Sequence, residues 1–217
     1  MKNTLKGIGK EIKYHNVFLL FMIGCILGVI VEGLFCYFKR GEWETHVTFL
    51  WGPFNIVYGL GAVVMYLAST ELDGKSIFTQ FVCFTFFGSA IEWLMGFIQD
   101  KLFNSYSWSY GKLTMGKYLS VPFALAWGLL GLIFMKVFMP FISKCFEHTE
   151  SKKWRSFSKV FTVFMCINLL LSVAVFIRWG QRAKSPEPRT RIEKFIDKKY
   201  SNEYLQARFV EWKMNDV

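Results

Sequence analysis

Histidine is scarce in this chain, and none of its three copies lies within a long apolar stretch. The sequence has no HExxH motif, no GxSxG motif and no paired-glutamate protease motif, so the usual signatures of membrane hydrolases are missing. A complete phosphate-binding loop is missing too, because Gly74-Lys75-Ser76 lacks the earlier glycine of that motif. We therefore predict no ATPase site within this chain.

Cysteine is also used sparingly. The five cysteines form no CxxC pair. Cys25, Cys83 and Cys166 lie inside apolar stretches, Cys36 lies near the end of one and Cys145 lies beside one. Buried thiols of this kind usually behave as small apolar groups. The sequence therefore predicts neither a disulfide nor a metal site, and no cofactor.

Acidic residues are few compared with basic ones: 16 Asp and Glu stand against 26 Lys and Arg, which gives a formal net charge of +10. The basic residues cluster at the ends of apolar stretches. That distribution is typical of anchoring to anionic lipid at a membrane surface and argues against nucleic acid as a partner.

Apolar side chains dominate what remains. Hydrophobic residues make up 53% of the chain and aromatic residues 19%, which is more than a soluble domain of this size needs. Four stretches are long enough to cross a hydrocarbon core, which takes about 17–25 helical residues. A fifth, 49–69, is apolar throughout but is interrupted near its start by Gly52-Pro53. We predict an all-α, polytopic integral membrane protein with five transmembrane helices, at 16–38, 49–69, 77–98, 119–142 and 159–179.

The chain divides into five segments by composition. A basic segment, 1–15, precedes a four-helix membrane core at 16–142, and a basic connector, 143–158, leads to the fifth helix. The tail, 180–217, is basic, and within it 190–213 carries apolar residues near helical spacing. This pattern favours a C-terminal amphipathic helix on the membrane surface. A helix that docks on this protein or on a partner fits the same pattern.

The core contains an internal repeat. Gly28-Val-Ile-Val-Glu32 resembles Gly88-Ser-Ala-Ile-Glu92, and PFNIVYGLG, which begins at Pro53, resembles PFALAWGLLG, which begins at Pro122. Because both motifs occur twice in the same order, we predict two copies of one helical hairpin, at about 16–69 and 77–142. A two-helix repeat re-enters the membrane in the same orientation, so the copies should be related by an axis along the membrane normal.

The repeat places Glu32 and Glu92 at matching depths. Burying an acid at a helix centre costs roughly 2.5–3.5 kcal/mol, so intramembrane carboxylates indicate a functional site. The prolines, and loops that carry His46 and three lysines, Lys101, Lys112 and Lys117, converge on the same face. The candidate ligand-binding residues are Glu32, Glu92, Asn55, Pro53, Tyr58, Trp108, Tyr110 and Trp127. In the alternative interpretation, the glutamates pair with Asn55, a loop lysine or freed backbone amides and simply hold the bundle together.

With these residues assembled, 24–139 resembles the ABC-transporter permeases of type IV, which share their domain with small four-helix transmembrane proteins of animals. The family usually has Trp-Asp-Tyr in the loop after the third helix, and this chain has Ser109 in place of the acid. The resemblance implies a polytopic membrane protein of unproven activity. The residues that carry it are Glu32, Tyr58-Gly59, Glu92-Trp-Leu-Met-Gly96, Trp108-Ser-Tyr110, Gly116 and Trp127-Gly128, with a weaker echo at 196–200.

Three functions fit these features. The favoured one is a small permease-like or transporter-accessory protein, with the paired glutamates binding a proton, a cation or a cationic substrate. Five helices are few for a complete carrier, so a homodimer or a partner subunit is implied, and an ABC role needs a separate ATPase. A structural or sensory protein that binds lipid or a partner through the tail is the alternative.

An enzyme with Glu32 and Glu92 as general base and acid ranks lower, and a metal held by Glu32, Glu92 and His46 is only weakly indicated. Basic residues of the core favour a cytoplasmic N-terminus, although the basic tail argues the other way. We expect a multi-pass protein of the plasma membrane with the glutamate face outside.

Overall fold

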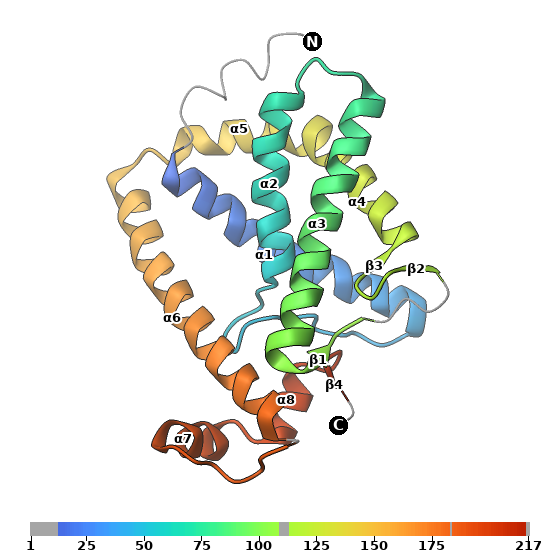
Figure 1. Ribbon diagram of the computed structural model, residues 1–217. Coiled ribbons are helices and arrows are strands. Elements are labelled where there is room, and N and C mark those ends of the chain that lie inside the picture. Colours follow the sequence, from blue (N-terminus) through green and yellow to red (C-terminus); the bar gives the residue numbers. More distant parts are fainter. Residues whose placement is uncertain (1–12, 109–112, 183, 216–217) are drawn as a thin grey trace.

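The structure, a computed structural model, describes residues 13–108, 113–182 and 184–215. It is mostly helical, with four very short strands (Figure 1). The elements, in chain order, are α1 (Tyr14–Arg40), α2 (Ile56–Leu72), α3 (Ile77–Phe103), β1 (Ser105–Tyr106), β2 (Thr114–Met115), β3 (Leu119–Ser120), α4 (Val121–Ile133), the π-helix η3 (Phe134–Phe138), α5 (Met139–His148), α6 (Lys152–Arg182), α7 (Arg191–Lys199), α8 (Asn202–Arg208) and β4 (Lys213–Met214).

In the part of the chain that the structure describes, four helical stretches are long and apolar enough to cross a membrane: α1, α3, the composite Val121–Phe146 and α6. The helix α2 is apolar but shorter, so the second predicted span is helical only from Ile56. The residues before it form a loop in which Gly52 has a φ of 78°, a value that favours glycine. The Asn55 side chain then accepts a bond from the Val57 N–H and begins the helix. The predicted break at Gly52-Pro53 is therefore a non-helical entry into α2.

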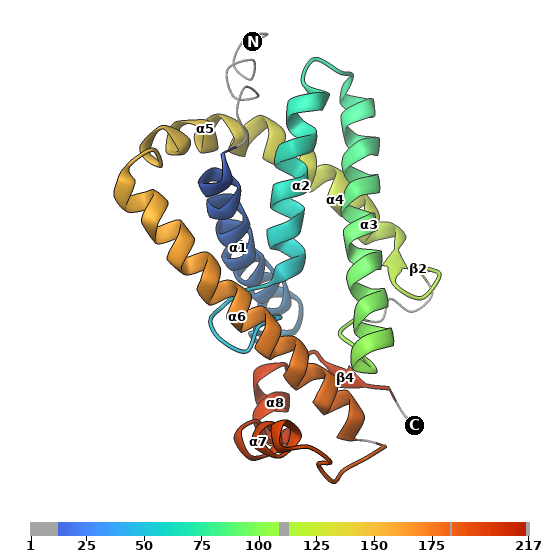
Figure 2. The same ribbon diagram turned by 60° about the vertical axis from the view of Figure 1, so that its left-hand side comes forward.

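The fourth span is not a single regular helix. Its middle turn is the π-helix η3, and Pro140 follows within the first turn of α5. Because Pro140 has no backbone N–H, the regular hydrogen-bond ladder is interrupted there. Figures 1 and 2 show the result: α4 rises along α3, and α5 then turns away across the end of the bundle near the start of α1.

The two predicted hairpins make equivalent contacts. A Cβ at Gly28 would lie 2.3 Å from Tyr58 Cγ, and a Cβ at Gly88 would lie 2.4 Å from Trp127 Cγ. Tyr58 and Trp127 occupy matching positions in the repeated Pro-Phe motif. Glycine thus brings α1 against α2 and α3 against α4 in the same way, as small residues do in membrane helix pairs. That the copies superpose by rotation about the membrane normal stays a prediction.

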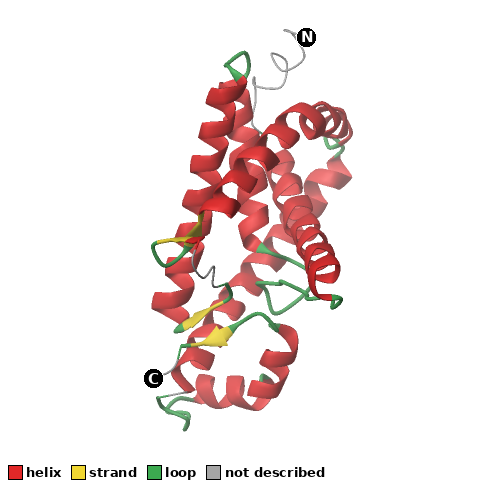
Figure 3. Ribbon diagram, turned by 90° about the vertical axis from the view of Figure 1, so that its right-hand side faces the viewer, coloured by secondary structure: helices red, strands yellow, loops and turns green. Residues whose placement is uncertain are grey.

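The C-terminal tail docks on this chain as two short helices, whereas the sequence favoured one surface helix. Figure 3 shows α7 and α8 gathered at the end of the bundle where α3 finishes, and there β4 pairs with β1. One continuous apolar cluster joins the tail to α6 and to the end of α3. Its buried members there are Phe103, Val175, Phe176, Trp179, Ile196, Tyr200, Leu205, Phe209 and Trp212.

Charged side chains reinforce this docking. Arg178 of α6, whose side chain is 3% exposed, places Nη2 2.6 Å from Asp197 Oδ2. Arg182 binds the other carboxylate oxygen of Asp197 at 2.8 Å. These hydrogen bonds hold the pKa of the Asp197 carboxyl below its usual value. The Asp197 carboxylate, which two arginines of α6 bind, therefore holds α7 against the C-terminal end of α6.

Candidate functional site

Glu32 of α1 receives a hydrogen bond from the neighbouring helix of its own hairpin. The Tyr58 hydroxyl of α2 donates to Glu32 Oε1 at 2.5 Å. The absence of a side chain at Gly28, one turn before Glu32, leaves room for the Tyr58 ring. The repeated Gly-xxx-Glu motif therefore places an aromatic donor beside its carboxylate.

Glu92 of α3 makes the equivalent contact in the second hairpin. The Trp127 indole of α4 donates from Nε1 to Glu92 Oε2 at 2.8 Å. Glu92 is 5% exposed and Trp127 is 8% exposed. Gly88 gives the indole its room, as Gly28 does for Tyr58.

The two donors also touch each other. The rings of Tyr58 and Trp127 have centroids 5.7 Å apart, at an interplanar angle of 38°. The outer edge of the Trp127 ring packs over Gly61 of α2, where an added Cβ would meet it at 3.1 Å. Glu32, Tyr58, Trp127 and Glu92 thus form one connected row from the first hairpin to the second. We call these four residues the glutamate–aromatic row.

A polar cluster extends this row beyond Glu32. The second oxygen of Glu32, Oε2, lies 3.9 Å from His46 Nδ1 in the loop after α1. The other ring nitrogen of His46 lies 3.2 Å from Glu44 Oε2 and 3.2 Å from Cys36 Sγ. The loop after α1 thus places His46 beside Glu32.

Asn55 positions the loop, and neither Asn55 nor Pro53 reaches the glutamates in the contacts that the structure describes. Asn55 donates from Nδ2 to the His46 carbonyl at 2.7 Å while capping α2. Its own backbone N–H donates to the Cys25 carbonyl of α1 at 3.1 Å. Pro53 is exposed. Asn55 thus fixes where His46 lies relative to the row.

The loop after α3 forms a different site. Lys117, expected near the glutamates, has Nζ 2.5 Å from Asp100 Oδ1, and Lys101 lies 3.3 Å from Oδ2 of the same carboxylate. The Tyr118 hydroxyl donates to Asp100 at 2.8 Å. The hydrogen bond to Asp100 raises the pKa of the Lys117 ammonium. Asp100, which the sequence pattern did not single out, therefore binds loop lysines that the alternative interpretation offered to the glutamates.

Of the remaining candidates, Trp108 donates from its indole to the Tyr118 carbonyl at 3.3 Å. It lines a cavity of about 400 Å³ with Gly96, Gln99 and Tyr118, and neither glutamate of the row lines this cavity. Tyr110 and Lys112 lie outside the described residues.

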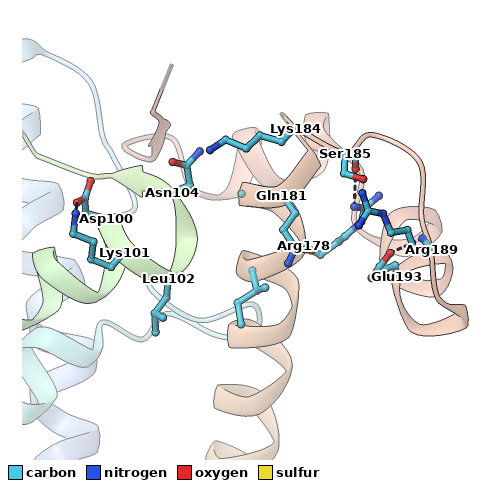
Figure 4. Close-up of a pocket in the computed structure, with 12 residues that line it drawn as sticks. Asp100, Lys101, Leu102, Asn104, Arg178, Gln181, Lys184, Ser185, Arg189 and Glu193 are labelled. Carbon is cyan, nitrogen blue, oxygen red and sulfur yellow. Dashed lines mark hydrogen bonds and ion pairs between the residues drawn. The ribbon is translucent and has the colours of Figure 1, made fainter. Parts of the chain in front are cut away.

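A second cavity, of about 430 Å³, lies between the ends of α3 and α6 and the start of α7. Figure 4 shows Asn104 and Lys184 pointing toward each other across it, and Arg178 reaching toward the Ser185 segment. The Arg178 guanidinium is engaged by Asp197 and by the carbonyls of Ser185 and Pro186. This cavity belongs to the seam between the tail and the bundle and not to the glutamate–aromatic row.

The region that contains the glutamate–aromatic row resembles a known protein family. The sequence pattern of the family described as Putative ABC-transporter type IV matches residues 19–173. The chain belongs to this family. The matched region contains both hairpins and every member of the glutamate–aromatic row. No curated protein and no solved structure gave a match.

In this type IV chain, the residues that carry the resemblance also make the described contacts. Glu32 pairs with Tyr58 and Glu92 pairs with Trp127, and Gly59 and Gly128 follow the two aromatic donors. The tail lies outside the match, yet it packs on the end of α6 within which the match ends. The family, together with the four long apolar helices, identifies a multi-pass membrane protein of transporter type.

Proposed function

We propose that this protein is a small permease-like or transporter-accessory component whose polar intramembrane site is built from Glu32 and Glu92. The observation that carries the proposal is the glutamate–aromatic row, in which both carboxylates accept from neutral donors. A neutral donor orients a carboxylate without cancelling its charge. In a low-dielectric bundle such a group favours a proton or a cation, which supports a cation or proton site.

The row gives this site a means of communication between hairpins. The hydroxyl of Tyr58 and the indole of Trp127 are hydrogen-bonded to different glutamates while their rings touch. A proton or cation that binds Glu32 changes the Tyr58 hydrogen bond, and the contact between the rings passes that change to Trp127. Coupling between the two carboxylates therefore needs no direct contact between them.

The number of spans bears on partners. Within the described residues, four long spans and one shorter apolar helix are few for a complete carrier, so we propose a homodimer or a partner subunit, with a separate ATPase in an ABC role. Anionic lipid is the expected surface partner of the tail. On α7, Ile192 is 70% exposed and Phe195 is 58% exposed, among the basic residues Arg191, Lys194 and Lys198.

The test of the site uses glutamine. Glu32→Gln and Glu92→Gln each keep an acceptor oxygen for Tyr58 or Trp127, so we expect each to change the free energy of unfolding by less than about 1 kcal/mol. Both should abolish cation-dependent proton uptake into proteoliposomes, read with an internal pH dye. Glu71→Gln, at an exposed position near the end of α2, is the control and should keep the wild-type rate.

Two outcomes would contradict the proposal. Glutamine variants that are stable and fully active would mean that the carboxylates are only tolerated. Variants that lose several kcal/mol of stability would instead favour the structural alternative, in which the row holds the hairpins together.

We also propose a plasma-membrane location with the N-terminus cytoplasmic and the glutamate face outside. Leu113 is exposed in the segment between α3 and β2. In a variant lacking the native cysteines, Leu113→Cys should react with an impermeant maleimide added to whole cells. Reaction only after the cells are opened would contradict this orientation and place Leu113 on the cytoplasmic side.

A further inference from the structure

Three potential metal ligands converge where α1 ends. Cys36 Sγ and His46 Nε2 are 3.2 Å apart, His46 Nε2 and Glu44 Oε2 are 3.2 Å apart, and Cys36 Sγ and Glu44 Oε2 are 3.7 Å apart. Cys36 is 2% exposed, and the side chains of Glu44 and His46 are 17% and 19% exposed. The three atoms therefore form a compact, mostly buried triangle.

This triangle has the dimensions of one face of a tetrahedral zinc site. Zinc binds sulfur at about 2.3 Å, imidazole nitrogen at about 2.0–2.1 Å and carboxylate oxygen at about 2.0–2.2 Å. Tetrahedral angles at those lengths place neighbouring ligand atoms roughly 3.3–3.6 Å apart. The edges of the triangle differ from these values by only a few tenths of an ångström, so an ion fits with small side-chain shifts.

Other residues complete the surroundings of such an ion. Glu32 Oε2 lies 3.9 Å from His46 Nδ1, on the side of the ring away from the triangle. Carboxylates in this position orient metal-binding histidines. Asn55 Nδ2 donates a hydrogen bond to the carbonyl of His46 and so holds the backbone of that residue in place. The ring of His46 is therefore held with Nε2 toward Cys36 and Glu44.

The local charge also favours a cation. Two carboxylates flank the ring of His46. Glu44 Oε2 lies 3.2 Å from its Nε2, and Glu32 Oε2 lies 3.9 Å from its Nδ1.

In the structure, Arg40 supplies the positive charge. Its Nη2 lies 3.0 Å from Cys36 Sγ and 2.7 Å from Glu44 Oε2. The Arg40 side chain is 51% exposed, so its guanidinium has a route toward solvent. The guanidinium of Arg40 therefore bridges two of the three potential ligands and supplies the positive charge that a metal ion would otherwise supply.

We propose that Cys36, Glu44 and His46 bind a Zn²⁺ ion, with Glu32 orienting His46 and water in the fourth position. A thiolate, an imidazole and a carboxylate together favour Zn²⁺ over Mg²⁺ or Ca²⁺. On binding, the Cys36 thiol releases its proton to solvent as the metal–sulfur bond forms, and Arg40 withdraws. The inference does not rest on the transport function, because it concerns a different set of ligands. The sequence alone did not indicate these ligands, since Glu44 carries no ligand motif and Cys36 reads as an apolar group, and its weak metal hypothesis named Glu32 and Glu92 with His46.

The test uses the full chain in detergent and Co²⁺ as a coloured stand-in for Zn²⁺. We expect one equivalent of Co²⁺ to give thiolate-to-metal charge-transfer absorption, which Zn²⁺ then displaces. Cys36→Ser should remove the charge-transfer band. Cys166→Ser, at an exposed position in α6, is the matched control and should leave the band unchanged.

Two further variants test the roles assigned to Glu32 and Arg40. Glu32→Gln should weaken Zn²⁺ binding about 10–100-fold without removing the band, as expected for a residue that acts through His46. Arg40→Ala should strengthen binding, because the competing cation is gone. Wild-type protein without the charge-transfer band, or Cys36→Ser with an unchanged band, would overturn the proposal. Because binding is measured without transport, these outcomes do not depend on whether the proposed function holds.

Discussion

Replacing Asp197 with alanine is expected to lower the free energy of unfolding of the docked tail by about 3 kcal/mol. The variant leaves the Arg178 guanidinium buried without its carboxylate, and breaking a buried pair costs about 3–5 kcal/mol. We expect the lower end of that range, because the Asp197 side chain is 22% exposed. Arg178 also keeps its bonds to the carbonyls of Ser185 and Pro186.

Limited trypsin digestion in detergent measures this effect, because the tail carries many basic residues that become cleavable only when it opens. A loss of about 3 kcal/mol corresponds to roughly a 100-fold faster tail cleavage if opening precedes cutting. Glu187→Ala, an exposed acid of the same segment, is the control and should cleave at the wild-type rate. Equal rates for all three proteins would show that the carboxylate does not hold the tail.

The same ion pair predicts a pH dependence. The pKa of Asp197 is lowered in the folded chain, first by the hydrogen bond to Arg178 and then by Arg182. Its stabilisation is therefore fully present above the unfolded aspartate pKa of about 3.9 and is lost as pH falls through the lower folded value. Tail cleavage by a protease active in acid should rise there in the wild type but stay unchanged in Asp197→Asn.

The second large effect is expected at Gly88. A Cβ added there would lie 2.4 Å from Trp127 Cγ and 2.5 Å from its Cβ. Because the Trp127 Cβ is fixed to the backbone of α4, a change of side-chain rotamer cannot relieve the clash, and the helices must separate. We expect Gly88→Ala to cost at least about 1–3 kcal/mol and to weaken the hydrogen bond from Trp127 to Glu92.

Gly61→Ala provides a graded control on the same indole. Its added Cβ would meet the outer edge of the Trp127 ring at 3.1 Å, a contact that a small ring movement relieves. Thermal unfolding in detergent should rank wild type, then Gly61→Ala, then Gly88→Ala, from most to least stable. Gly28→Ala should resemble Gly88→Ala, since its clash with Tyr58 is equivalent. A Gly88→Ala protein as stable as the wild type would contradict the close approach of α3 and α4.

The sequence by itself determined the membrane class and the approximate positions of the spans, and it predicted the hairpin repeat. These features depend on local quantities: the length of an apolar run, a proline that cannot donate, and a glycine one turn before a glutamate. The same periodicity also singled out Tyr58 and Trp127, because they occupy matching positions in PFNIVYGLG and PFALAWGLLG. Their hydrogen bonds to Glu32 and Glu92 follow from that spacing once the helices pair.

Only the tertiary structure decided which polar groups meet. Lys101 and Lys117 pair with Asp100 and not with a glutamate of the row, because α3 continues beyond 98 to Phe103 and carries Asp100 to the level of the loop. Cys36 and Glu44 meet His46 through a loop conformation that no helical period encodes. The tail itself folds back because its apolar face matches α6 and Phe103. An amphipathic pattern specifies that one face of a helix must be buried. Which surface buries that face is determined only by the neighbours that pack against it in the tertiary structure.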